Sequence, residues 1–137
     1  MATLTPTLTL VSTDALTDSL NISVTDSLSV LGQSKRFTVI IDSSEDELFA
    51  DAGPVLAAAD YTKSYVFFQN KSSTSAEVIT LGLADNDASG DDALETTNIT
   101  LGAGEFAFYP WDSSTDIIAD AASGTPVLEV MVFQAAA

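Results

Sequence analysis

The sequence contains no cysteine and no histidine among its 137 residues. Without cysteine the chain has no disulfide, no thiolate-ligated zinc site and no thiol nucleophile. Without histidine it lacks the commonest metal ligand and the usual general base near neutral pH. Ser-His-Asp and Cys-His catalytic arrangements are therefore excluded. A chain of this length still buries enough surface to fold as one domain without such staples.

Basic residues are also scarce, with 4 Lys and Arg against 20 Asp and Glu, so the net charge is −16. Such a chain repels the phosphates of nucleic acids and anionic membrane surfaces, and we expect it to bind neither. The acidity predicts solubility and little non-specific association. A surface that meets a basic partner is the alternative interpretation.

Long apolar runs are missing as well, and none approaches the roughly 20 residues that span a bilayer. The first ten residues lack a positively charged segment, and threonine interrupts them at every second position. We therefore expect no secretory signal, and a protein made and used in soluble form in a bacterial or viral setting.

The N-terminal segment alternates threonine with leucine. Leu4, Leu8 and Leu10 fall on one side of an extended chain, and Pro6 interrupts it. Residues 1–12 are therefore predicted to be an edge strand or a free arm. The next segment has an apolar face broken only by Asp26, where a bend or bulge is expected. That face consists of Leu20, Ile22, Val24, Leu28 and Val30.

Further strand patterns with turn signals between them follow as far as residue 133. Gly102–Gly104 is typical of a tight hairpin. The acidic segment 43–60 predicts either a short helix at 45–50 or a loop. About eight or nine strands in a single domain, 1–137, favour an all-β fold, an antiparallel β-sandwich or jelly roll. The later strands are expected at 37–41, 65–69, 77–83, 97–101, 105–111, 115–119 and 127–133.

Two acidic patterns carry candidate chemistry. Asp85–Asp91 resembles the first half of a calcium loop, but position twelve is Thr96 and Glu95 comes one residue early, so a solvated turn is the alternative. Glycoside hydrolysis needs two carboxylates across a cleft. Glu77, Glu105 and Glu129 lie in or beside strands, and we interpret them as outward-facing residues. We therefore predict no enzyme activity, no cofactor and no assigned metal site.

Aromatic residues cluster near the end of the 105–111 strand. Alternation sends Phe106 and Phe108 to one face, and Tyr109 and Trp111 to the other. One face then belongs to the core and the other is available to a partner. We predict that Tyr109 and Trp111 form the interface pair. Together with the arm, the predicted interface residues are Leu4, Leu8, Leu10, Tyr109 and Trp111.

Three stretches resemble small virion structural proteins of tailed bacteriophages that infect marine and cyanobacterial hosts. They are the Thr-Leu opening with the Ser-Leu-Asn-Ile-Ser-Val-Thr-Asp-Ser-Leu run at 19–28, the segment SYVFFQNKSS at 64–73, and LGAGEFAFYPW at 101–111. The resemblance covers most of the chain except 43–60. It implies a virion component and brings no catalytic residues.

The role implied by the resemblance is a capsid decoration, or cement, protein made in the bacterial cytoplasm of the host. Such proteins form homo-oligomers, usually trimers, and bind the major capsid protein on the capsid surface. A tail fibre, tube or adaptor subunit is one alternative. A carbohydrate-binding or calcium-dependent adhesion module is another, and an enzyme is the weakest.

Overall fold

The computed structural model describes residues 1–14, 17–42, 54–84 and 94–136. Within these ranges the chain forms ten strands and one 3-10 turn, η1 (Ala58–Asp60), and it contains no α-helix. The strand pairs with defined register are all antiparallel. The predicted all-β, antiparallel class is therefore confirmed. The alternative of a helix or a loop at 45–50 lies outside the described residues.

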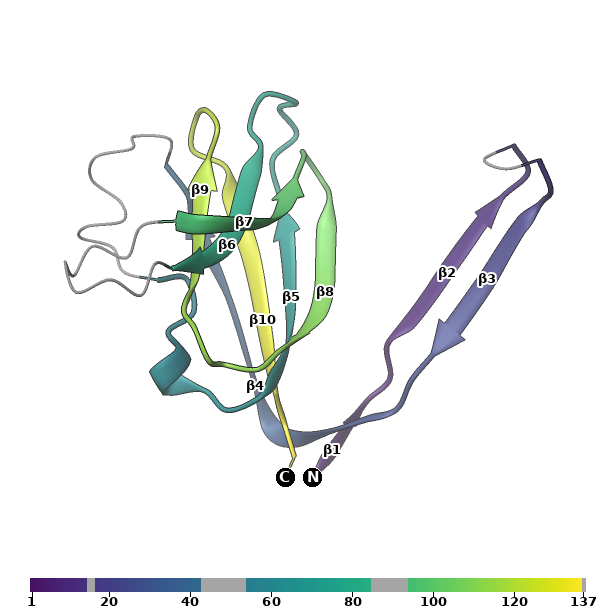
Figure 1. The fold of residues 1–137 in the computed structure, drawn as a ribbon, viewed down its shortest axis with the longest axis horizontal. Helices are drawn as coiled ribbons and strands as arrows, with labels where there is room; N and C mark the ends of the chain where they lie inside the picture. The colour runs from purple at the N-terminus through teal and green to yellow at the C-terminus, as the bar shows by residue number, and fades with distance from the viewer. Residues whose placement is uncertain (15–16, 43–53, 85–93, 137) are drawn as a thin grey trace. The chain divides into compact units, whose positions relative to one another are not determined.

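The chain divides into two units, one of residues 1–32 with the C-terminal residues from 135, and one of residues 33–134. In the first unit, β1 (Ala2–Leu4) pairs with the beginning of β4 (Leu28–Ile40). Two further strands, β2 (Thr7–Ser12) and β3 (Leu20–Thr25), form a separate two-stranded sheet (Figure 1). The predictions of one domain and of an arm over 1–12 stay predictions.

Short links join the hairpin to the rest of the first unit. Two residues separate β1 from β2, and two separate β3 from β4. The Asp26 N–H donates to the Pro6 carbonyl at 3.1 Å and so ties the two links together. Proline has no N–H for a ladder, and the strand pattern stops at Pro6 as predicted. The bend expected at Asp26 is a complete break between two strands.

The second unit contains two sheets that share one core. Their strand orders are β4-β10-β5-β8 and β7-β6-β9. Figure 1 shows β7, β6 and β9 lying over the larger sheet. Beyond β4, the strands are β5 (Ser64–Asn70), β6 (Ile79–Ala84), β7 (Leu94–Leu101), β8 (Phe106–Trp111), β9 (Ile117–Ala121) and β10 (Val127–Ala135).

Alternation along the strands builds this core. Every second residue of β5 is buried, from Ser64 to Asn70, and Val66 and Phe68 are fully buried there. The other sheet contributes residues such as Ile79 and Leu81, which are likewise fully buried. Because successive side chains of a strand point to opposite faces, each buried residue places its neighbours on the outside.

The turn at 102–105 is not the hairpin that its glycines predict. It joins β7 to β8, which belong to different sheets. The Glu105 N–H donates to the Gly102 carbonyl at 3.0 Å, and Gly104 has φ +78, which favours glycine. The glycines therefore mark a tight turn, as expected, but the turn passes the chain from one sheet to the other.

Asn70, at the end of β5, ties the two sheets together at this turn. It is fully buried, and its side-chain amide donates to the carbonyls of Glu77 at 2.7 Å and Leu101 at 3.1 Å. Its side-chain oxygen accepts from the Ser72 N–H at 3.0 Å. Its backbone bonds Glu105 and Gly104, each at 3.0 Å. Every polar group of this buried residue therefore has a partner, which is the condition for burying it.

We expect Asn70→Ala to lower the free energy of unfolding by about 2 to 4 kcal/mol, because it leaves two buried carbonyls without their donor. Urea unfolding followed by Trp111 fluorescence measures this loss. Asn98→Ala is the matched control, since Asn98 is exposed on β7 and surface substitutions change stability by less than about 0.5 kcal/mol. Equal losses in the two variants would contradict the assigned role of Asn70.

Candidate protein-interaction surfaces

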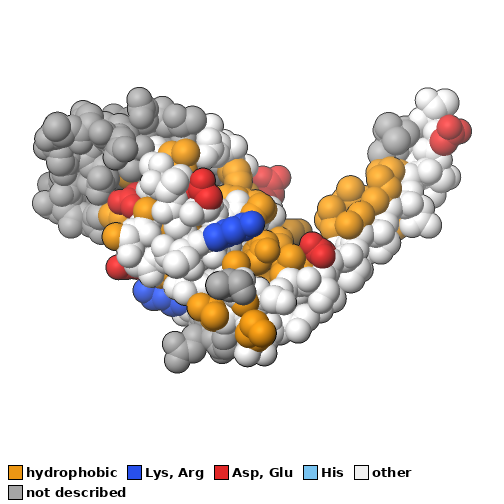
Figure 2. Space-filling view, turned by 60° about the horizontal axis from the view of Figure 1, so that its bottom comes forward, with side chains coloured by type: hydrophobic (Ala, Val, Ile, Leu, Met, Phe, Trp, Pro, Cys, Tyr) orange, Lys and Arg blue, Asp and Glu red, His pale blue; other side chains and the backbone are white. Residues whose placement is uncertain are grey.

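The β2–β3 hairpin carries an apolar face. The register places Leu8 opposite Val24 and Leu10 opposite Ile22. These four side chains are 51, 57, 44 and 42% exposed, respectively. Leu20, opposite Ser12, lies on the same face. We call Leu8, Leu10, Leu20, Ile22 and Val24 the hairpin face, and Figure 2 shows apolar side chains gathered along this ribbon.

The opposite side of the hairpin is mostly polar but uncharged. There the Thr7 and Thr25 hydroxyls share a hydrogen bond of 3.0 Å. Neither strand contains a charged residue, and the acidic residues Asp14, Asp18 and Asp26 lie beyond the strand ends. An isolated two-stranded ribbon is marginally stable in water. Covering the hairpin face would therefore stabilise it.

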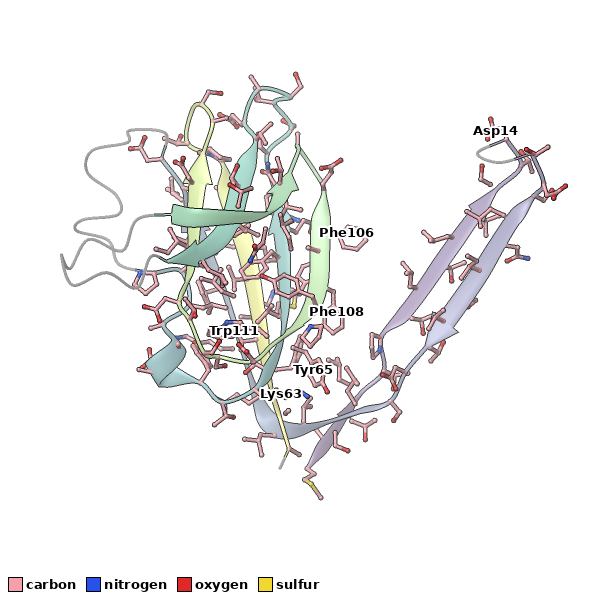
Figure 3. All side chains as sticks on the ribbon, in the orientation of Figure 1. Asp14, Lys63, Tyr65, Phe106, Phe108 and Trp111 are labelled. Carbon is pink, nitrogen blue, oxygen red and sulfur yellow. The ribbon has the colours of Figure 1, made fainter. Side chains whose placement is uncertain are left out.

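The larger sheet of the second unit has an apolar outer face, the side turned away from the core. The register sets Phe67 between Met131 and Phe108, and Tyr65 opposite Phe133. The stacked pairs are Tyr65 with Phe108 and Phe67 with Phe106, at centroid distances of 6.4 and 6.1 Å. Phe106 is 62% exposed (Figure 3). We call Tyr65, Phe67, Phe106, Phe108, Met131 and Phe133 the outer face.

Basic side chains border this outer face. Arg36 forms an ion pair with Glu129 at 3.2 Å. Glu129 is the single acidic residue in the sequences of β4, β5, β8 and β10, the strands of this sheet in the second unit. Lys71 contacts the Gln69 amide oxygen at 3.5 Å, on the same side as Phe67. Lys63 directly precedes β5, at the Tyr65 end of the face (Figure 3). The outer face is thus apolar, with Lys63 and Lys71 at its border, Arg36 paired with Glu129, and Glu105 directly before Phe106.

The two faces of β8 are the reverse of the predicted assignment. Trp111 is 4% exposed and donates from Nε1 to the Thr115 carbonyl at 3.1 Å. Tyr109 packs against the core beside Phe68, with ring centroids 6.0 Å apart. Alternation separates the two sets of rings correctly, but Phe106 and Phe108 form the exposed set. A ring buried in its own chain offers little area to a partner.

The predicted arm residues fall in two places. Leu4 is half-buried in β1, opposite Leu28. Leu8 and Leu10 are exposed on the hairpin face. Sequence reasoning missed their cross-strand partners Val24 and Ile22 as interface candidates. The signal for them was present, because both strands alternate and both apolar sets belong on one face of a hairpin.

The three candidate carboxylates each make a local contact. Glu129 pairs with Arg36, Glu105 accepts from the Gly102 N–H at 2.7 Å, and Glu77 accepts from the Ser72 hydroxyl. No cluster of three metal-ligating side chains occurs in the described ranges. The calcium-loop pattern at 85–91 falls outside these ranges.

The described part of the chain also contains no helix that is long and apolar enough to cross a bilayer.

Tyr109 and Asp112, both at or next to β8, have shifted pKa values. Burial raises the pKa of Tyr109 from about 10 to about 12, because a low-dielectric environment disfavours the phenolate. Hydrogen bonds from the Ser114 hydroxyl at 2.8 Å and its N–H at 3.0 Å lower the pKa of Asp112. Asp112 is exposed in the turn after β8, so the bonds order that turn.

Tyr109 predicts a loss of stability at alkaline pH. Its folded-state pKa is raised, so its contribution is complete below about pH 10 and is lost as the pH rises toward 12. From about pH 9 to pH 11, the unfolding free energy should fall more for the wild type than for Tyr109→Phe. Solvent screening limits the difference to no more than about 1 kcal/mol. Urea titrations measure it, and identical pH profiles would contradict the buried placement of the hydroxyl.

Comparison with known proteins adds no family to this picture. A scan against protein-family models finds no match to the sequence. Searches of curated proteins and of solved structures likewise find no match.

Proposed function

We propose that this chain is a capsid decoration protein of a tailed bacteriophage, which binds the major capsid protein and stabilises its lattice. The observation that carries the proposal is a pair of apolar faces, built of exposed and half-buried side chains and free of unpaired carboxylates, on a chain of net charge −16. Exposed apolar patches of this kind mark protein interaction sites. The resemblance of residues 19–28, 64–73 and 101–111 to virion proteins names the kind of assembly.

The proposed architecture is an antiparallel β-sandwich with an N-terminal hairpin arm. Its support is the single core that the two sheets share, with Phe68 on one sheet and Leu81 on the other. The jelly roll is the alternative topology. The rigid two-layer body would present the outer face, and the hairpin would reach neighbouring subunits.

The proposed mechanism is multivalent clamping. Packaged DNA pushes capsid subunits apart, and a protein bound to several subunits at once raises the cost of separating them. A homo-oligomer, with a trimer favoured, supplies several such contacts at one local symmetry axis. The acidic remainder of the surface keeps decorated particles dispersed. The proposal requires no catalysis, cofactor, nucleic acid or membrane.

Quantitative mass spectrometry of purified phage particles tests this function. We expect a copy number equal to, or a fixed fraction of, that of the major capsid protein. A few copies per particle would place the chain in the tail as a fibre, tube or adaptor subunit. Absence from the particles would overturn the virion role and favour a carbohydrate- or calcium-dependent binding module.

A further inference from the structure

We infer that the hairpin face of one copy of this chain packs on the outer face of a second copy. The inference names the partner of the hairpin and rests on the proposed assembly function.

The two surfaces match in chemistry and in length. The hairpin face is aliphatic, and the outer face is built of stacked aromatic rings with Met131. A six-residue strand is about 20 Å long, so the hairpin has the length of β5 or β8. Aliphatic side chains that pack on rings remove apolar area of both from water. Neither surface has a large charged side chain in its centre.

The charges around the two surfaces are complementary. Residues 1–32 contain three acidic residues, Asp14, Asp18 and Asp26, and no lysine or arginine. All Lys and Arg residues of the chain lie in the second unit, where Lys63 and Lys71 border the outer face and Arg36 pairs with Glu129. The acidic ribbon is therefore attracted to the two lysines, which favours this pairing.

The hairpin of the same chain is the competing occupant of the outer face. We assign the face to a second copy because the proposed function is that of a homo-oligomer, and the double-cysteine variant below separates the two.

The contact uses two different patches of the chain and is therefore heterologous. Such contacts generate closed rings when the rotation closes and open filaments when it does not. A ring gives each copy one covered hairpin and one covered outer face. Three copies closing in this way would form the trimer favoured above.

Cysteine cross-linking of the purified full-length chain tests the inference directly, because the natural sequence has no cysteine. A tagged Leu10→Cys chain is mixed with an untagged Phe108→Cys chain and oxidised. We expect a disulfide between the two chains, identified by the tag and by peptide mass. Thr9→Cys mixed with Phe108→Cys is the matched control, because Thr9 lies on the opposite side of the ribbon. The control should form at least tenfold less mixed disulfide.

Three results would overturn the inference. Closure within a single Leu10→Cys, Phe108→Cys double variant, without mixed dimers, would assign the outer face to the hairpin of the same chain. Disulfides of Leu10→Cys only with itself would assign the hairpin face to another hairpin. A monomer without cross-links would leave the face to the capsid protein. Each of these leaves the particle copy number, and so the proposed function, to be judged separately.

Solution mass gives a second readout without cysteines. The wild type should sediment as an oligomer of the 14.3 kDa chain. Leu10→Ser and Phe108→Ser should each raise the dissociation constant at least tenfold, and Thr9→Ser should not. Trp111 fluorescence verifies that the body stays folded in each variant. Unchanged association in Leu10→Ser and Phe108→Ser with a folded body would contradict the inference.

Discussion

The buried amide of Asn70 is the interaction on which the body of this protein depends. It joins the end of β5 to the carbonyl of Leu101, on the other sheet, and to that of Glu77, just before β6, and so fixes how the ends of the two sheets meet. With Asn70 held inward, the period of two sends Phe68 and Val66 into the core and Phe67 and Tyr65 outward. The inward position of the Asn70 amide thus determines which residues of β5 form the outer face. A shift of a single residue along β5 would exchange the two faces of this strand.

Net charge is the second constraint, and it limits where copies of the chain can approach one another. A charge of −16 makes most close approaches between copies repulsive. The hairpin ribbon and the outer face are exceptions, since the strands that form them contain one acidic residue, Glu129, which Arg36 neutralises. In the proposed assembly, acidity and apolar faces act together: the net charge would suppress random association, and the two apolar faces would permit a small number of specific contacts.

Local alternation predicts much of the fold but not its long-range pairing. The strands β5, β8 and β10 lie close to their expected positions, and the breaks at Pro6 and Asp26 follow from proline chemistry and from the pattern. Alternation also separates Phe106 and Phe108 from Tyr109 and Trp111. It does not say which set is inside, because that depends on which strand pairs with β8 and on which side the second sheet lies. Prediction from local sequence has the same limit at the glycine turn after Leu101. The glycines indicate a tight turn, but not whether that turn closes a hairpin or passes the chain to the other sheet.

The hairpin offers two kinds of contact surface, its apolar face and its strand edges, and these would serve the proposed self-assembly and the proposed lattice binding separately. Its face is apolar, while its sheet contains only β2 and β3 in the described part of the chain, so each strand keeps one edge without a neighbour. Free edges add strands of a partner through backbone hydrogen bonds, whereas a face binds through side chains. In the proposed assembly, a second copy would occupy the hairpin face while a capsid subunit would extend an edge. Loss of the face contact would then also weaken lattice binding, because an uncovered two-stranded ribbon does not hold its edges in a fixed geometry.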